Sequence, residues 1–230
     1  MRTAILRFPG SNCEAETVRA VERAGGEAFY VSHRDPGLNG AEAVILPGGF
    51  SYGDYLRSGA IARFSPVLEA VRLHADQGGP VLGICNGFQI LCEAGLLPGA
   101  LVRNATLRYL SRPVTIRVER IDTPFTRDFE AGEVLTIPVG HGDGRYVAAE
   151  AELAELESNR QVVFRYWGPD QPGVPANPNG SARDIAGICN RAGNVVGMMP
   201  HPERLAHPTQ GPSDGSRVFA SLLQSLAQRT

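Results

Sequence analysis

The residue whose surroundings most clearly indicate chemistry is Cys85, which follows a short apolar run and precedes a helical pattern. Glycines stand two positions to either side of it, at Gly83 and Gly87. This Gly-x-Cys-x-Gly pattern is typical of a nucleophile elbow, a turn so sharp that neighbouring side chains would clash. The dipole of the following helix favours a thiolate, and the N–H of Asn86 would point at an oxyanion. The alternative is a small buried cysteine on an ordinary turn.

A base for this thiol is predicted near the other end of the chain, where Glu203 follows His201 by two positions. In an extended segment, residues two apart project to the same side. The carboxylate would then accept the imidazole Nδ1–H and leave Nε2 free to exchange a proton with the thiol. Pro200 and Pro202 are expected to exclude helix here. His-Pro-Glu alone is also compatible with a surface turn, but together with the elbow it predicts a Cys–His–Glu triad.

A third segment, Pro47-Gly48-Gly49, ends another apolar run with bare backbone that a ligand can approach closely. A tetrahedral oxyanion is best held by two donors. We therefore expect the N–H of Gly49 to complement that of Asn86, and Gly48 to lie against the substrate. Taken alone, Pro-Gly-Gly is a tight turn and nothing more.

The elements that must position these residues alternate between apolar runs and helical patterns over the first two-thirds of the chain. Such alternation is typical of a parallel α/β sheet. Strands are expected over residues 4–8, 27–32, 43–46 and 80–84. Helices are expected over 13–24, from Pro66, with Ser65 as its N-cap, to Gly78-Gly79, and over 86–94.

The rest of the chain has a different pattern, with strands joined by turns rich in Gly, Asn and Pro. Strands are expected over residues 114–120, 133–139, 161–166, 184–189 and 195–198, with a hairpin over 190–194, a long loop over 167–181 and a last helix over 215–229. We therefore predict one α/β domain over residues 1–230. Its central sheet is expected to be mixed, mostly parallel and flanked by helices, with a small antiparallel section.

Several motifs together resemble a known family. Gly-x-Cys-x-Gly-x-Gln, followed far along the chain by His-x-Glu, is similar to the class I (triad) glutamine amidotransferases, which have a flavodoxin-like fold. Within that superfamily, four stretches resemble the glutaminase subunits of phosphoribosylformylglycinamidine synthase, at residues 7–13, 46–57, 86–89 and 198–204. The run Gly-Phe-Ser-Tyr-Gly-Asp-Tyr distinguishes them from the GMP, CTP, anthranilate and carbamoyl-phosphate relatives.

The resemblance implies a reaction and partners. Glutamine is hydrolysed to glutamate, and the ammonia passes to a large ATP-dependent synthase subunit. That subunit converts formylglycinamide ribonucleotide to formylglycinamidine ribonucleotide in purine biosynthesis. A small bridging subunit normally joins the two.

The resemblance also implies roles for individual residues. Cys85 would attack the carboxamide, His201 would pass the proton to the departing ammonia, and Glu203 would orient His201. Gln89 is expected to contact bound glutamine, and the backbone at Gly142 to hold its amino-acid end. His141, next to Gly142, is the alternative base.

The composition limits the cofactors. All 22 basic residues are arginine, so a P-loop lysine and a Schiff-base lysine are excluded. A GC-rich genome would explain the bias without altering this consequence. We expect no cofactor in this chain, with ATP and magnesium on the partner synthase subunit. The four cysteines lack CxxC spacing, which predicts reduced thiols and no metal site.

Charge and hydropathy patterning suggest where the protein acts. The formal net charge of −2 gives no electrostatic signature of a nucleic-acid or membrane partner. No apolar run approaches the roughly 20 residues that a membrane helix needs. Arg7 interrupts the first apolar run, so a strand is favoured over a signal peptide and a cytoplasmic location is expected.

Two rival functions remain open. A cysteine peptidase on the same fold is the first, although peptidase relatives carry a histidine directly after the elbow cysteine, where this chain has Asn86. A non-catalytic subunit that binds a partner is the second. The segment Ser51–Arg57, polar and aromatic, is a candidate for contact with a partner or for packing within the chain.

Overall fold

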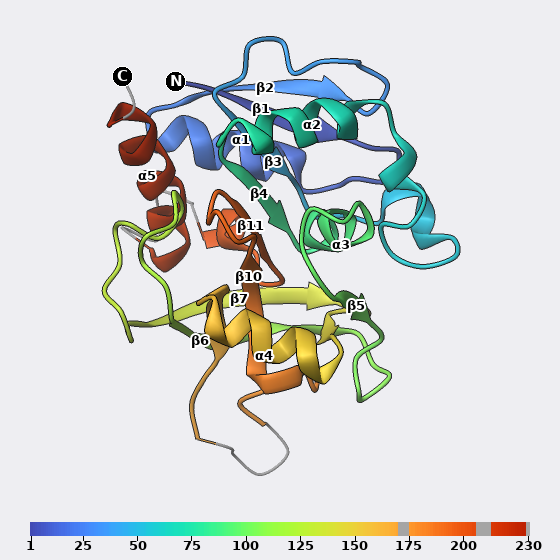
Figure 1. Cartoon of the computed structure of the whole chain (residues 1–230), viewed down its shortest axis with the longest axis vertical. Coiled ribbons are helices and arrows are strands. Elements are labelled where there is room, and N and C mark those ends of the chain that lie inside the picture. The colour runs from blue at the N-terminus through green and yellow to red at the C-terminus, as the bar shows by residue number, and fades with distance from the viewer. Residues whose placement is uncertain (170–174, 206–212, 229–230) are drawn as a thin grey trace.

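A computed structural model of the protein describes residues 1–169, 175–205 and 213–228. A nine-stranded sheet runs through it in the order β2-β1-β3-β4-β11-β10-β9-β6-β7 (Figure 1). The first five strands pair in parallel: β2 (Glu27–Ser32), β1 (Arg2–Arg7), β3 (Ala43–Leu46), β4 (Val81–Ile84) and β11 (Val195–Met198).

The other half of the same sheet is antiparallel. It consists of β10 (Ile185–Cys189), β9 (Val162–Tyr166), β6 (Leu110–Val118) and β7 (Val134–His141). β5 (Ala100–Val102) and β8 (Arg145–Val147) form a separate two-stranded antiparallel sheet. The expected mixed α/β sheet is confirmed, and its antiparallel section is continuous with the parallel one.

The burial patterns explain this division. Every residue of β3, β4 and β11 is buried, as expected for parallel strands that are covered on both faces. β7 begins with alternating exposed and buried residues, which is typical of an antiparallel strand with one solvated face. The hairpin expected over residues 190–194 joins β10 to β11.

Among the described residues, five α-helices pack around the sheet: α1 (Glu14–Arg23), α2 (Val67–Asp76), α3 (Asn86–Glu93), α4 (Glu150–Ser158) and α5 (Asp214–Ala227). α3, which begins directly after Cys85, lies against β3, β4 and β11. α1 packs on β1 and β2 and also touches α5. Among the described residues, no helix is long and apolar enough to cross a membrane.

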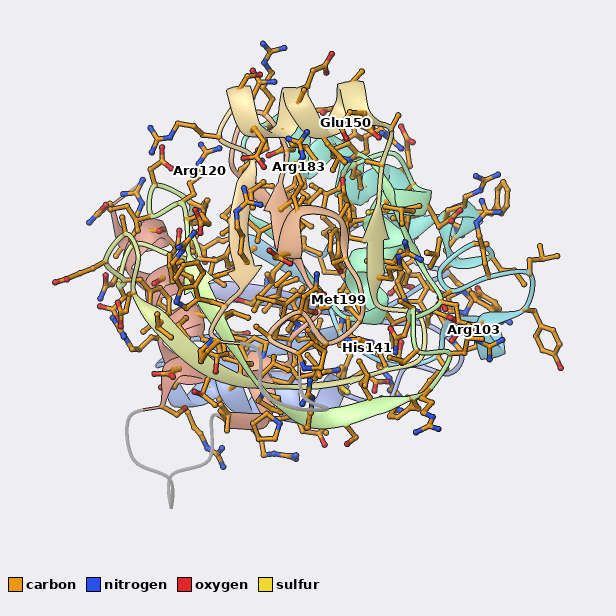
Figure 2. The ribbon with its side chains drawn as sticks, turned by 90° about the horizontal axis from the view of Figure 1, so that it is seen from below. Arg103, Arg120, His141, Glu150, Arg183 and Met199 are labelled. Atoms are coloured by element: carbon orange, nitrogen blue, oxygen red, sulfur yellow. The ribbon has the colours of Figure 1, made fainter. Side chains whose placement is uncertain are left out.

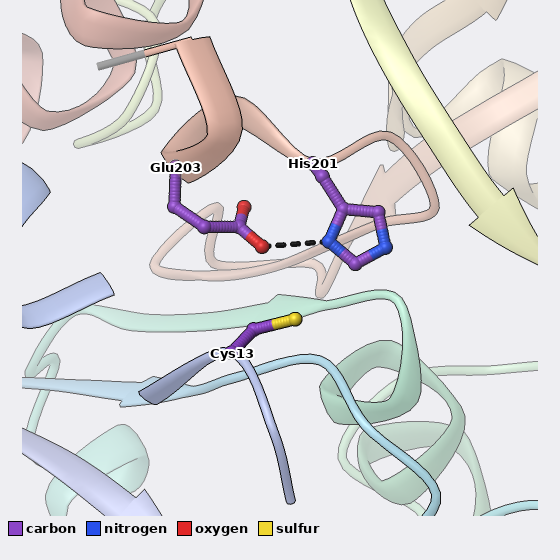
Figure 3. Close-up of side chains that lie close together, drawn as sticks. All are labelled: Cys13, His201 and Glu203. Atoms are coloured by element: carbon purple, nitrogen blue, oxygen red, sulfur yellow. Dashed lines mark hydrogen bonds and ion pairs between the residues drawn. The ribbon is translucent and has the colours of Figure 1, made fainter. Parts of the chain in front are cut away.

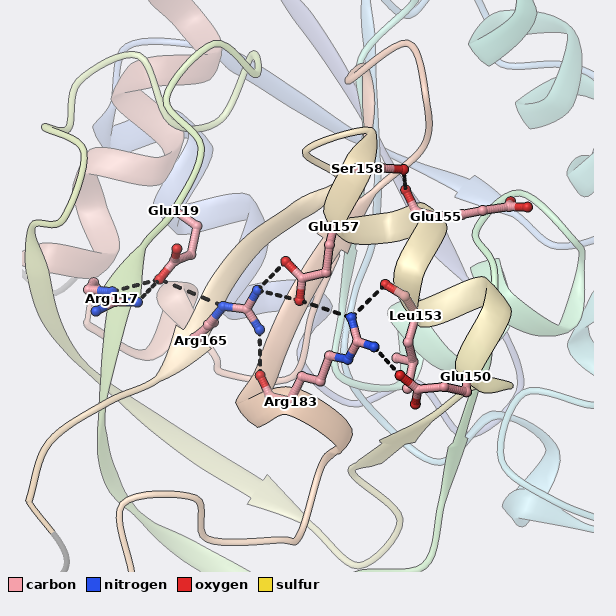
Figure 4. Close-up of polar contacts among 9 residues, drawn as sticks. All are labelled: Arg117, Glu119, Glu150, Leu153, Glu155, Glu157, Ser158, Arg165 and Arg183. Atoms are coloured by element: carbon pink, nitrogen blue, oxygen red, sulfur yellow. Dashed lines mark hydrogen bonds and ion pairs between the residues drawn. The ribbon is translucent and has the colours of Figure 1, made fainter.

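Among the helices, α4 is the one that the sequence did not predict, because its two buried side chains, Leu153 and Leu156, give only a weak helical periodicity. Ion pairs attach it to neighbouring elements (Figure 4). Arg165 on β9 donates to both carboxylate oxygens of Glu157 at 2.7 Å. Arg183, in a 3₁₀ turn, donates to Glu150 and to the carbonyl of Leu153. The partly exposed pairs each contribute only about 0.2–1 kcal/mol, so their main effect is to fix where α4 lies.

One local prediction is wrong. The segment after His201 was expected to be extended, but Pro202–Leu205 forms a 3₁₀ turn. Proline is tolerated at the first position of such a turn, because its fixed φ suits the turn and its missing N–H would have no partner there. The long loop predicted over residues 167–181 lies partly outside the described residues.

Candidate active site

Four loops meet at one edge of the parallel half of the sheet. They follow β1, β3, β4 and β11, which are neighbours in the strand order. Parallel strands place their carboxyl ends on the same edge, where α/β proteins bind their ligands. The four loops carry Cys13, Gly49, Cys85 and His201.

Cys85 occupies a sharp strand-to-helix turn, as the glycine pattern predicts. Its backbone has φ 51° and ψ −104°, which is strained for a residue with a side chain. A Cβ at Gly87 would lie 2.0 Å from the carbonyl oxygen of Leu46, and one at Gly83 would lie 2.7 Å from the Gly87 backbone. Glycine is therefore required at both positions. The backbone N–H of Cys85 donates to the carbonyl of Met198 at 2.8 Å, which ties the turn to β11.

His201 and Glu203 form a buried pair, with side chains 1% and 0% exposed (Figure 3). The distance between His201 Nδ1 and Glu203 Oε1 is 2.6 Å. Because a carboxylate only accepts, Nδ1 carries the proton. The ring is further fixed by the backbone N–H of His201, which donates to the carbonyl of Pro138 at 2.8 Å. Nε2 is buried and makes no hydrogen bond within the described part of the chain.

The surroundings of His201 favour the imidazolium. Burial alone would lower its pKa, but the Glu203 carboxylate and the sulfur of Cys85 outweigh burial and raise the pKa of His201 well above its usual value. An imidazolium next to a cysteine stabilises the thiolate, which is the nucleophilic form. The Cys85 sulfur otherwise contacts the carbonyl of Gly140 at 3.7 Å.

Cys85 also lines a small cavity of about 90 Å³. Three of the residues predicted to bind substrate or oxyanion line it as well: Gly49, Gln89 and Gly142. A cavity of this size suits a small amide better than a folded polypeptide. Gly48 lies instead against His201, where an added Cβ would be 2.7 Å from the imidazole Cε1.

The amide of Gln89 is engaged within the protein. Its Oε1 accepts from the side chain of Asn86 at 2.9 Å, and its Nε2 donates to the carbonyl of Asp143 at 2.6 Å. The side-chain oxygen of Asn86 accepts in turn from the N–H of Ser51 at 3.1 Å. These two side chains hold the loops around the cavity to the elbow helix. Contact between Gln89 and glutamine stays a prediction.

Sequence reasoning did not identify Cys13 as part of this site. The structure places it beside the His201–Glu203 pair, with the three ligating atoms within 4.8 Å of one another (Figure 3). Its thiol donates to Asn12 Oδ1 at 3.1 Å and accepts from Arg204 at 3.5 Å. The available signal was its place at the start of the helix predicted after the first strand, at the edge where the other loops meet.

Cys13, His201 and Glu203 offer one thiolate, one imidazole and one carboxylate, a set that zinc could use. Their present bonds do not suit a metal. His201 Nδ1 donates a hydrogen bond to Glu203 Oε1. The Arg204 guanidinium donates a hydrogen bond to the Cys13 sulfur, so a positive charge already lies beside it. The arrangement fits an oriented catalytic imidazole better than a metal centre.

The alternative base, His141, lies in the interior together with Met199 (Figure 2). Its Nδ1 faces the side-chain oxygen of Asn104 at 3.1 Å. Burial and the nearby His201 lower the pKa of His141 to about 4. An amide oxygen orients His141, whereas a carboxylate orients His201, and we retain His201 as the predicted base.

Comparison with known proteins shows the family of the chain. The family model of the CobB/CobQ-like glutamine amidotransferase domain matches residues 1–221. Among curated proteins, the chain is 56% identical to the phosphoribosylformylglycinamidine synthase subunit PurQ of Gloeobacter violaceus, covering 98% of each chain. It is 53% identical to the PurQ subunit of Thermus thermophilus, covering 99% of this chain and all of the relative.

Solved structures of similar proteins also match nearly the whole chain. The PurLQS structure from Thermotoga maritima matches with a TM-score of 0.86 and 44% identity, covering 98% of both chains. The glutaminase domain of Trypanosoma brucei CTPS, solved with bound acivicin, matches with a TM-score of 0.64 at 13% identity and shares the fold.

Proposed function

Since the chain belongs to the glutamine amidotransferases, and within them to the family of phosphoribosylformylglycinamidine synthase PurQ subunits, we propose that it is the glutaminase subunit of that synthase. It hydrolyses glutamine to glutamate and supplies ammonia to an ATP-dependent synthase subunit. That partner converts formylglycinamide ribonucleotide to formylglycinamidine ribonucleotide. The observation that carries the proposal is that Cys85, on its strained turn, lines a small cavity and interacts with His201, which Glu203 orients.

The first half of the reaction uses Cys85 and His201. The thiolate attacks the side-chain amide carbon of glutamine, and the backbone N–H groups of Gly49 and Asn86 stabilise the oxyanion. His201 donates its Nε2 proton to the amide nitrogen as the C–N bond breaks, so that ammonia leaves and a thioester remains. Glu203 orients His201 throughout and stabilises the imidazolium form whenever it is present.

The second half regenerates the enzyme. Neutral His201 accepts a proton from water at Nε2, and the resulting hydroxide attacks the thioester carbon. The C–S bond breaks, which releases glutamate and restores the Cys85 thiolate next to the imidazolium. Water and glutamine are consumed, and ammonia and glutamate are formed.

The remaining parts of the proposal follow from the family. The whole chain acts as one amidotransferase domain that itself holds no cofactor, while ATP and magnesium bind the large synthase subunit. A small bridging subunit joins the two, and the complex acts in the cytoplasm. The absence of lysine supports placing the nucleotide on another chain.

The test compares three cysteine variants in the assembled complex, with glutamine or an ammonium salt as nitrogen donor. We expect Cys85→Ala to reduce glutamine-dependent synthesis by at least about 1000-fold, as when a nucleophile is removed from a triad. Synthesis from ammonium should be largely unaffected, because the partner performs that step.

Cys13→Ala and Cys92→Ala are the matched controls. Cys13 also contacts His201 but does not line the cavity, and Cys92 lies on α3 with its sulfur facing the carbonyl of Pro98. Both variants should retain glutamine-dependent synthesis within about tenfold, since neither forms the thioester. If Cys13→Ala abolished glutamine-dependent synthesis while Cys85→Ala did not, the nucleophile would be misassigned. If Cys85→Ala lost synthesis from glutamine and from the ammonium salt alike, Cys85 would have a structural role.

A further inference from the structure

Among the described residues, His141 and His201 are the two buried histidines, and their rings have different partners. His201 Nδ1 bonds to the Glu203 carboxylate at 2.6 Å, whereas His141 Nδ1 lies 3.1 Å from the side-chain oxygen of Asn104. His141 lines the cavity beside Cys85. Neither His141 nor Asn104 takes part in the steps proposed above. A proton on this second imidazole would nevertheless oppose the charge of His201, because like charges destabilise each other.

The amide of Asn104 is fully buried, and its partners leave it only one orientation. One end of the amide lies 2.8 Å from the carbonyl oxygen of Arg108 and 3.0 Å from that of His141. Carbonyl oxygens only accept, so this end is the nitrogen. The other end accepts from the N–H of Gly144 at 3.0 Å, so it is the oxygen. His141 therefore faces an acceptor that has no proton to donate.

This acceptor fixes the tautomer of His141. Nδ1 carries the proton that it donates to Asn104, which leaves Nε2 bare in the neutral ring. Nε2 is buried and has no hydrogen-bond partner within the described part of the chain. Burial and the charge of His201 oppose a proton at Nε2 and lower the pKa of His141 to about 4. His141 is therefore neutral at neutral pH.

The backbone holds Asn104 against this ring. Its N–H donates to the carbonyl of Gly142 at 2.9 Å, and its carbonyl accepts from the N–H of Leu107 at 2.9 Å. Leu107 has a left-handed φ of 58°, which closes the turn that starts at Asn104. Asn104 thus joins the loop after β5 to the cavity wall that contains His141. The fold therefore sets the position of the amide.

Other ionisable groups act on His141 at the same cavity. The positive charge of His201 opposes an imidazolium at His141. Negative charges would favour one, and the acidic groups that line the cavity with it are Asp54, Cys85, Tyr109 and Asp143. His201 has a carboxylate at Nδ1, which raises its pKa, and His141 has an uncharged amide there. The difference between a carboxylate and an amide at Nδ1 therefore separates the two histidines.

We propose that Asn104 is a positioning residue for glutamine hydrolysis: it holds His141 neutral in one tautomer, so that the imidazolium beside Cys85 is that of His201. Two imidazolium ions at one buried cavity would repel each other, and His201 would then lose the proton that stabilises the thiolate. Asn104 acts through His141 rather than on the substrate. The inference rests on the proposed function and adds to it the residue that determines which histidine is charged.

The first test follows the His141 ring by NMR in the full-length chain with isotope-labelled histidine, using His141→Gln to assign its signal. In wild type, the ring should be neutral above about pH 5, with Nδ1 protonated and Nε2 bare. Asn104→Asp places a carboxylate at Nδ1. It should raise the midpoint of the His141 titration by about 2–3 pH units, because the carboxylate stabilises the imidazolium.

Asn179→Asp is the matched control. Asn179 is also fully buried behind the same wall, where its amide contacts the carbonyl of Gly144 at 2.8 Å and the side chains of Tyr166 and Ser181. This variant therefore buries a carboxylate nearby without placing it at the Nδ1 of His141. The midpoint of the His141 titration should stay nearly unchanged.

The second test measures the consequence for the reaction in the assembled complex. Relative to wild type, glutamine-dependent synthesis by Asn104→Asp should be about two- to tenfold lower at pH 6 than at pH 8, because His141 gains its charge as the pH falls. Asn179→Asp should lose the same factor at both pH values, and so should Asn104→Asp combined with His141→Gln, which has no ring to charge. Synthesis from an ammonium salt, measured in parallel, removes the pH dependence of the partner.

Three results would overturn the role of Asn104. One is a wild-type His141 that is protonated at Nε2 in its neutral form, which is measured without any variant. Another is an unchanged His141 midpoint in Asn104→Asp. The third is a relative activity of Asn104→Asp that stays constant between pH 6 and pH 8 although His141 titrates there. A wild-type complex that released no glutamate from glutamine would instead overturn the proposed function, and the NMR measurement would still report the charge of His141.

Discussion

At the scale of single residues, the charge state of the His201–Glu203 pair determines how the site responds to pH. The pair is fully buried, and the carboxylate outweighs the effect of burial on the imidazole. A histidine whose pKa is higher in the folded than in the unfolded protein binds an extra proton on folding over the interval between the two values. The stability that it contributes is complete below the unfolded pKa, near 6.5, and is lost as the pH rises through the folded value.

Glu203→Gln is expected to remove most of this pH dependence, because the amide cannot stabilise the imidazolium. The free energy of unfolding of wild type, relative to that of Glu203→Gln, should fall as the pH rises from about 6.5 into the alkaline range. Urea unfolding of both proteins at a series of pH values measures this difference. A difference that stayed constant or increased with pH would show that His201 is neutral in the folded protein.

At the scale of elements, the elbow depends on the close approach of α3 to β3. Gly87, in the first turn of α3, faces the backbone of Leu46 so closely that no side chain fits. The strained backbone of Cys85 is maintained by the packing of these elements and by its bond to β11. The same contacts therefore stabilise the fold and position the nucleophile.

Gly87→Ala should consequently be destabilising by about 3 kcal/mol or more, since its methyl group would force α3 away from the backbone of β3. Gly37→Ala is the matched control, because a Cβ there would meet nothing within 4 Å and its φ is not in the left-handed region. Urea unfolding measures the free energy of unfolding of both variants. Equal stability of the two variants would show that α3 can shift without cost and that the elbow is less rigid than its geometry indicates.

At the scale of the whole molecule, an exposed segment lies beside the catalytic cavity. Next to Asp54, which lines the cavity, Tyr55 and Leu56 are 75% and 89% exposed. Exposed apolar side chains beside a catalytic cavity are suited to contact with a partner, so for Tyr55 and Leu56 the exposure favours partner contact over packing within the chain, the two alternatives for Ser51–Arg57.

We therefore expect the isolated chain to hydrolyse glutamine at least about tenfold more slowly than the assembled complex with its substrates, because loop ordering commonly gates such sites. Release of glutamate, measured with and without the synthase and bridging subunits, tests this. Equal rates would show that the site is already competent in the free chain.

The sequence by itself determined much of this architecture, because the governing physics is local. Continuous apolar runs located β3 and β4, and paired glycines identified Cys85 at a strand-to-helix turn. The helix α4 escaped prediction because only two of its side chains are buried, too few for a clear periodicity. The turn that begins at Pro202 was not predicted, because proline was expected to exclude helix, although it disfavours only the interior of a helix and not its first position.

Only the tertiary structure decided which distant residues share the site. Cys13 and His201 are far apart in sequence, and they meet because β1 and β11 place their carboxyl ends on one edge of the sheet. Similarly, Asp54 and Asp143 converge on one cavity through the contacts of Ser58 and Gln89. Residue types and short spacings can reveal a nucleophile and its base, but the strand order selects the other side chains that surround them.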